Sequence, residues 1–84
     1  MELKLKSLEQ ITKSLPSQWE GESYKGEYIY IRGDKDELTV QTANNNKEEW
    51  NNNNFETVFF TKISGYCAIM DTCEMLKITG LQFN

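Results

Sequence analysis

Glu27-Tyr28-Ile29-Tyr30-Ile31-Arg32 is the most regular segment of this chain. Its aromatic and β-branched residues favour extended backbone, and they alternate with a period of two. Successive side chains of a strand point to opposite faces of its sheet, so Tyr28 and Tyr30 share one face while Ile29 and Ile31 share the other. The segment therefore predicts a strand with one aliphatic face and one aromatic face.

Two further strands are predicted beside this segment. Residues 18–23 alternate polar with small or aromatic side chains, and Tyr24-Lys25-Gly26 has the composition of a turn. Gly33-Asp34-Lys35-Asp36 predicts a second turn, and residues 37–42 predict another strand. Three short strands with tight connections favour an antiparallel meander.

The two ends of the chain carry helical patterns. Within residues 3–15 the apolar side chains recur every three or four positions, as on one stripe of a helix: Leu5, Leu8, Ile11 (or Thr12) and Leu15. Pro16 ends this helix, because proline disfavours helical geometry in the residue before it. Residues 72–79 predict a second short helix, with Asp71 as its N-cap and Gly80 as its C-terminal stop.

Residues 43–54 are rich in asparagine, which competes for backbone hydrogen bonds, so they predict a loop. Residues 55–63 predict a fourth strand, whereas Tyr66–Met70 fits an extension of that strand, a fifth strand or a loop.

These elements predict a single α+β domain over residues 1–84, in the order α-β-β-β-loop-β-α. It is a small antiparallel sheet of about four strands with two short helices on one face. We expect the helices to pack on the sheet and to bury a core made of Leu5, Leu8, Ile11, Leu15, Met75 and Leu76 from the helices and Trp19, Ile29, Ile31, Leu38 and Val40 from the strands.

The composition of the chain argues against several classes of function. The formal charge is −4 with a pI near 4.7, which argues against a nucleic-acid binder that needs clustered Lys and Arg. The chain contains no histidine, no run long enough to span a bilayer, and none of the usual nucleophile or phosphate-loop motifs. Cys67 and Cys73 have neither metal-site nor redox-motif spacing, and we interpret them as reduced structural thiols. We therefore expect no catalytic residue, no metal and no cofactor.

The aromatic face of the predicted sheet is the candidate contact surface, because rings are efficient interface anchors. Residues 20–37 hold six acidic and three basic side chains, so the meander is locally negative. Trp50 is either a ring that pins the asparagine-rich loop or an exposed anchor on it. The candidate partner-binding residues are Glu20, Glu22, Glu27, Tyr28, Tyr30, Asp34, Asp36, Glu37, Glu48, Glu49 and Trp50.

In small size, acidity and a composition typical of an A+T-rich genome, the chain resembles the small inhibitors that bacteriophages encode against host defences, of which anti-CRISPR proteins are the best-known group. The resemblance implies a protein that occludes the basic nucleic-acid-binding surface of a host effector such as a Cas protein, with carboxylates standing in for phosphates. It also implies a location in the host cytoplasm.

We therefore predict a non-catalytic, cytoplasmic protein-binding module whose partner is a protein, without direct contact to nucleic acid or membrane. The alternative is a small structural subunit that forms a homodimer through its aromatic sheet face or through an edge strand.

Overall fold

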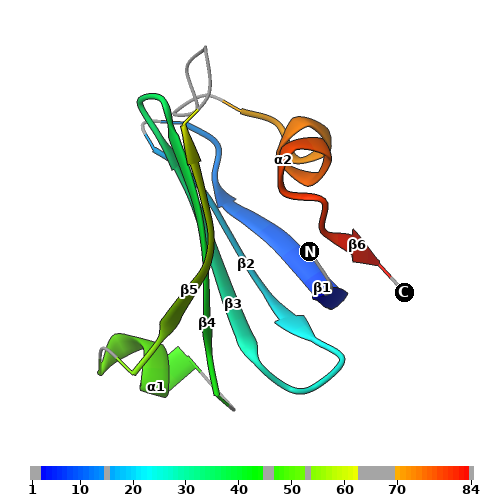
Figure 1. Ribbon diagram of the computed structural model, residues 1–84, viewed down its shortest axis with the longest axis vertical. Helices are drawn as coiled ribbons and strands as arrows, with labels where there is room; N and C mark the ends of the chain where they lie inside the picture. Colours follow the sequence, from blue (N-terminus) through cyan, green and yellow to red (C-terminus); the bar gives the residue numbers. More distant parts are fainter. Residues whose placement is uncertain (1–2, 15, 45–46, 53, 63–69, 84) are drawn as a thin grey trace.

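The computed structural model describes residues 3–14, 16–44, 47–52, 54–62 and 70–83. It contains six strands and two short helices, arranged as a curled mixed sheet with a helix on either side (Figure 1). The strands are β1 (Lys4–Thr12), β2 (Ser17–Ser23), β3 (Tyr28–Asp34), β4 (Glu37–Ala43), β5 (Glu56–Lys62) and β6 (Gln82–Phe83), and the helices are α1 (Lys47–Asn51) and α2 (Thr72–Thr79). The predicted α+β class is therefore wrong, because the described chain is mostly β, with six strands rather than four.

The strands lie in the order β5-β4-β3-β2-β1-β6. Neighbours from β5 to β1 are antiparallel, and β6 pairs with β1 in parallel. The predicted meander is confirmed for β2, β3 and β4, and the strand predicted over residues 55–63 is confirmed as β5 within its described part. Strand β6 lies beside the first strand of the chain, since Leu5 of β1 pairs with Phe83 of β6.

The first strand is the main correction to the predicted fold. Residues 3–15, predicted as an amphipathic helix, form β1 over most of their length. Leu5 lies opposite Ser23 and Leu8 lies opposite Gly21, so three steps along β1 match two steps along β2. This β-bulge places two leucines spaced three apart on the same face of a strand, although that spacing is typical of a helix.

A glycine allows β1 to approach β2 closely at this bulge. A Cβ atom on Gly21 would clash with the backbone carbonyl oxygen of Ser7. A side chain at this position would thus push the two strands apart, and glycine in a strand interior often marks such close backbone contact.

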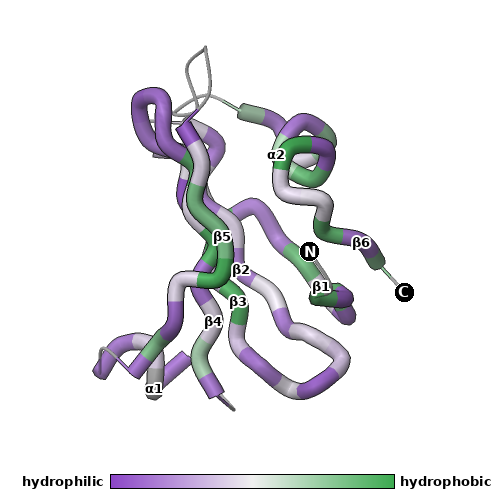
Figure 2. Tube along the Cα trace, in the orientation of Figure 1, coloured by the Kyte–Doolittle hydropathy of each residue, from purple (hydrophilic) through white to green (hydrophobic). Residues whose placement is uncertain are grey.

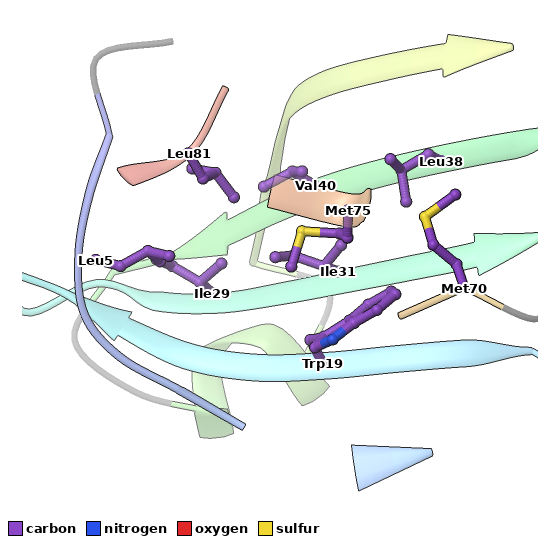
Figure 3. Packing of buried hydrophobic residues seen from close by; sticks show 9 residues of the cluster. All are labelled: Leu5, Trp19, Ile29, Ile31, Leu38, Val40, Met70, Met75 and Leu81. Carbon is purple, nitrogen blue, oxygen red and sulfur yellow. The ribbon is translucent and has the colours of Figure 1, made fainter. Parts of the chain in front are cut away.

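The core lies between the sheet and α2, on what we call the inner face: the face that carries Leu5, Trp19, Ile29, Ile31, Leu38 and Val40. Figure 3 shows these side chains pointing toward Met70, Met75 and Leu81, and all nine are at most 5% exposed. Hydrophobic residues also concentrate along β5, in α2 and in β1 in Figure 2.

Most of the predicted core is confirmed, and Leu8 and Leu76 pack against it. Ile11 is 43% exposed instead, because it is the extra residue of a second irregularity between Gln10 and Thr12, and Leu15 lies outside the described residues.

Helix α2 occupies the predicted residues, and both of its predicted ends are confirmed. The Asp71 carboxylate accepts a hydrogen bond from the Glu74 backbone N–H at 2.8 Å. Gly80 takes a left-handed conformation with φ of 73°, and its N–H donates to the Leu76 carbonyl at 3.0 Å. These two caps satisfy backbone groups that a helix of only eight residues would otherwise leave unpaired.

Polar contacts attach the start of α2 to the sheet. The buried Trp19 indole donates to the Thr72 hydroxyl at 2.8 Å, and the Gln10 amide donates to the Met70 carbonyl at 3.1 Å. The buried Ser17 hydroxyl accepts from the Met70 N–H at 2.9 Å. Because unpaired polar groups in a core are costly, these hydrogen bonds allow Trp19 and Ser17 to be buried and also fix where α2 lies.

Of the two helices in the described residues, only α2 covers the inner face, so the prediction of two helices on one face is wrong (Figure 1). The predicted asparagine-rich loop is also corrected, because residues 47–51 form the single-turn helix α1. Helix α1 lies on the opposite side of the sheet from α2 (Figure 1). Most of Tyr66–Met70, with its three open interpretations, lies outside the described residues, as does Cys67.

Candidate functional site

The candidate site is the side of the sheet turned away from α2, which we call the outer face. Strand alternation brings together the residues that lie between the core positions of β2, β3, β4 and β5. By register these are Gln18, Glu20 and Glu22, then Tyr28, Tyr30 and Arg32, then Thr39 and Gln41, and finally Phe60. The predicted separation of Tyr28 and Tyr30 from Ile29 and Ile31 is confirmed, since the isoleucines are buried and the tyrosines are half-buried.

Trp50 of α1 lies over the two tyrosines. Its ring centroid is 4.6 Å from that of Tyr30, 6.0 Å from that of Tyr28 and 6.1 Å from that of Phe55. Such distances are in the range of favourable aromatic pairs. Trp50 is half-buried, so it both pins its segment to the sheet and keeps part of its ring at the surface, which combines the two alternatives that the sequence left open.

The rings of Tyr28, Tyr30 and Trp50 are each held by a hydrogen bond from their polar end. The Tyr28 hydroxyl donates to Glu20 Oε2 at 3.0 Å, and the Tyr30 hydroxyl donates to Gln18 Oε1 at 2.6 Å. The Trp50 indole N–H donates to Gln41 Oε1 at 3.0 Å. Rings held in this way lose little conformational freedom on binding a partner, which favours affinity.

The same surroundings make the two phenols weaker acids. Burial is the main cause that raises the pKa of Tyr28 well above its usual value of 10, and the hydrogen bond and negative charge of Glu20 raise it further. Burial also raises the pKa of Tyr30, against an opposing effect of the Arg32 charge. Both hydroxyls are therefore protonated donors at neutral pH.

The predicted acidic residues do not form one patch. Glu20, Glu22, Asp34 and Glu37 lie on the outer face by register. Asp36 is exposed in the β3–β4 turn, and Glu48 is exposed on α1. Glu27 lies in the β2–β3 connection, where its carboxylate accepts from Ser23 Oγ at 3.2 Å, and the side chain of Glu49 is not described.

Three of the outer-face acids have basic partners on the same face. Lys47 lies 3.4 Å from Glu20, Lys6 lies 3.9 Å from Glu22, and Arg32 lies 3.4 Å from Asp34. Exposed ion pairs of this kind contribute little to stability. They do make the surface one of mixed charge rather than a continuous acidic strip.

Two hollows flank the rings. The larger, of about 540 Å³, is lined by Ser7, Leu8, Glu9, Glu20, Gly21, Glu22, Tyr28 and Lys47. The smaller, of about 270 Å³, is lined by Tyr30, Arg32, Thr39, Gln41 and Trp50. The first hollow has three carboxylates and one ammonium along its wall, and so it is suited to a basic side chain next to the Tyr28 ring.

Sequence reasoning missed Glu9, Lys47 and Gln41 as members of this face. Glu9 was missed because its segment was expected to be helical, and the strand register places it opposite Glu20. Lys47 reaches the site through α1, whose position on the sheet depends on contacts between distant residues, and no local signal in the sequence identifies it. Gln41 lies on the outer face by the alternation of β4, which is a local signal, but its hydrogen bond with Trp50 depends on where α1 lies.

The described residues were also searched for metal-binding groups, free thiols and helices that could cross a membrane. Among the described residues, no group of three or more Cys, Asp or Glu side chains is arranged to hold a metal ion. Cys73 is a free, exposed thiol on α2, and no described helix is both long and apolar enough to cross a membrane. No protein-family model, curated protein or solved structure was found to match the chain.

Proposed function

We propose that this protein is a non-catalytic module that binds a protein partner on its outer face. The rings of Tyr28, Tyr30 and Trp50 are the apolar anchors, and Glu20 and Glu22 supply polar contacts beside them. The single observation that carries the proposal is the half-buried ring cluster, held by three hydrogen bonds on the side of the sheet that α2 leaves open. Rigid aromatic anchors with a polar rim are typical of the energetic centre of protein interfaces.

The proposed partner presents basic side chains to this face. The larger hollow supports this, because its carboxylates Glu9, Glu20 and Glu22 outnumber its one ammonium, that of Lys47. A lysine or arginine from the partner would meet both charge and a ring there. Because the face also carries Lys6, Lys47 and Arg32 in ion pairs, we propose a mixed interface rather than imitation of a nucleic acid by charge alone.

The resemblance to phage-encoded inhibitors gives the proposal its most specific form. In that form the partner is a nucleic-acid-binding effector, and the module blocks its basic surface. Salt dependence tests this form, because charge pairs at the rim of an interface weaken as ionic strength rises. We expect affinity to fall roughly tenfold between about 50 mM and about 500 mM salt, and an affinity that does not change over this range would contradict it.

Capture from a host lysate with charge-reversed variants tests the site itself. The test variant is Glu9→Lys with Glu22→Lys, two exposed side chains on the wall of the larger hollow. The matched control is Glu74→Lys, which changes another exposed acid, on α2 on the other side of the sheet. Each protein is first shown to be folded by circular dichroism.

We expect the double variant to lose its captured partner and the control to retain it. In purified form, the affinity of the double variant for that partner should fall at least tenfold. Retention of the partner by the double variant, or its loss by the control, would remove the outer face from consideration.

A further inference from the structure

The outer face has two hollows that differ in charge. Three carboxylates and one ammonium line the larger hollow, whereas Arg32 is the one charged residue among the described residues that line the smaller. The two hollows are neighbours, because Tyr28 lines the first, Trp50 lines the second and their ring centroids are 6.0 Å apart. A partner that covers the ring cluster therefore meets a negative hollow and a positive one.

The larger hollow favours a basic side chain from outside. Glu9 lies opposite Glu20 in the pairing of β1 with β2, so two carboxylates lie side by side on the outer face. Like charges directly opposite each other on neighbouring strands are unfavourable. A lysine or arginine between them would relieve this repulsion and would also contact the Tyr28 ring.

The smaller hollow favours an acidic side chain. The side chain of Arg32 is 51% exposed, and its ion pair with Asp34 at 3.4 Å lies at the surface. Exposed ion pairs of this kind are worth little, so a carboxylate from a partner can replace Asp34. Arginine commonly binds carboxylates in a bidentate manner, and the Thr39 hydroxyl and the Gln41 amide add donors on the wall of the same hollow.

The spacing of the two hollows indicates an extended segment. Tyr28 and Arg32 lie on the same face of β3, four residues apart, which is about 13 Å at about 3.3 Å per residue. Residues i, i+2 and i+4 of an extended chain also point the same way, so its first and fifth residues can enter the two hollows. In a helix, residues four positions apart are separated by only about 6 Å and would not reach from one hollow to the other.

We propose that the partner binds through an extended segment with a basic side chain in the larger hollow and an aspartate or glutamate, four residues away in either chain direction, against Arg32. The residue midway between them is apolar or aromatic and packs on the exposed part of the Trp50 ring. This inference rests on the proposed function, and it adds the acidic half of the partner's surface and the spacing of the partner's charges.

Selection of peptides by the purified protein tests the inference without knowledge of the natural partner. The probe is a phage-displayed library of random peptides of about twelve residues, which is long enough for an extended segment to cross both hollows. We expect the enriched peptides to carry a basic and an acidic residue about four positions apart, with an apolar residue between them. One such peptide is then synthesised, and its affinity is measured by isothermal titration calorimetry.

A charge swap tests the contact of Arg32 with the acidic residue of the peptide. Arg32→Glu should weaken binding of the peptide at least about tenfold, and a peptide whose acidic residue is replaced by lysine should recover most of that loss. The matched control is Lys77→Glu, which makes the same change of charge at an exposed lysine on α2 and should leave the affinity unchanged. Thermal unfolding shows whether each variant is folded.

The outcomes separate this inference from the proposed function. Enriched peptides that carry basic residues alone, or that bind Arg32→Glu as tightly as wild type, would overturn the inference and leave the outer face as the binding surface. Failure of the lysine-swapped peptide to recover binding to Arg32→Glu would overturn it as well. Peptides that bind the double variant Glu9→Lys, Glu22→Lys as tightly as wild type, or a library without any enriched peptide, would contradict the outer face itself.

Discussion

Replacing Trp50 with alanine should separate the stability of α1 from that of the domain. Helix α1 has only five residues, and helices this short have no stability of their own in water. Its described attachments to the sheet are the Trp50 ring, the hydrogen bond from Trp50 to Gln41 and the ion pair of Lys47 with Glu20. Trp50→Ala removes the first two, so α1 should detach.

The expected loss of stability in Trp50→Ala follows from two quantities: the free energy that the contacts of Trp50 contribute, and the conformational entropy that is lost when α1 is ordered on the sheet. Half of an indole buries about 100 Å², worth about 2.5 kcal/mol at about 25 cal/mol per Å². The hydrogen bond and the ring contacts add about 1 kcal/mol each. Ordering the five residues of α1 costs about 1 kcal/mol per residue, so the two sides nearly cancel. The net docking free energy is thus small, and it limits the loss of global stability in Trp50→Ala to about 1 kcal/mol.

Hydrogen exchange measures the stability of α1, and denaturant unfolding measures the stability of the whole domain. The Asn52 N–H donates to the Glu48 carbonyl at 3.1 Å, so its exchange rate reports whether α1 is formed. We expect fast exchange at Asn52 in Trp50→Ala and an unfolding free energy within about 1 kcal/mol of wild type. In Trp50→Phe, which keeps a smaller ring and loses the Gln41 hydrogen bond, the exchange rate of Asn52 should lie between those of Trp50→Ala and wild type.

The loss of stability in Trp50→Ala can be compared with that caused by a substitution in the core, and this comparison can refute the prediction. Trp19 is fully buried, and Trp19→Ala should cost about 3–5 kcal/mol. If Trp50→Ala destabilised the protein as much as Trp19→Ala, α1 would be part of the cooperative core. If Asn52 kept its protection in Trp50→Ala, the ring would not be what holds α1 on the sheet.

Three further substitutions test the backbone and the phenols. Gly21→Ala should destabilise the domain by more than about 2 kcal/mol in chemical unfolding, because its methyl group meets the Ser7 carbonyl; an unfolding midpoint like that of wild type would show that β1 can move aside. Lys35 has a φ of 54°, so Lys35→Gly should raise stability by about 0.5–1 kcal/mol, and a lowered melting temperature would contradict this. The stability that the raised phenol pKa of Tyr28 provides is complete below pH 10, its unfolded value, and is lost as pH rises above it. Tyr28→Phe should therefore make the fall in stability above about pH 10 shallower, and a fall as steep as that of wild type would contradict the assignment.

The parts of the fold that the sequence predicts well are those with local causes. Helix α2 is specified by Asp71 before it and Gly80 after it, and both caps form within a few residues of the chain. The β2–β3–β4 meander is specified by alternation and by turn residues, which are also local. Short-range signals of this kind do not depend on how the rest of the chain packs.

The parts that could not be predicted depend on distant partners. The sequence predicts that Trp50 either pins its loop or is an exposed anchor, but its neighbours Tyr30 and Gln41 are known only once α1 is placed on the sheet. The acidic residues were expected to act together because they are close in sequence, yet strand alternation and turns direct Glu20 and Glu27 to different places. Proximity along a strand does not imply a shared face.

The error over β1 is connected to the candidate site. The spacing of Leu5 and Leu8 indicated a helix because a strand without a bulge would place the two leucines on opposite faces. The bulge brings both to the inner face, and Gly21 lets the bulged strand lie close to β2. The residues around this irregularity, from Ser7 to Glu9 on β1 together with Gly21, line the larger hollow of the outer face. The departure from regular strand spacing that conceals β1 in the sequence therefore also helps to shape the surface to which we assign binding, as bulges near functional sites commonly do.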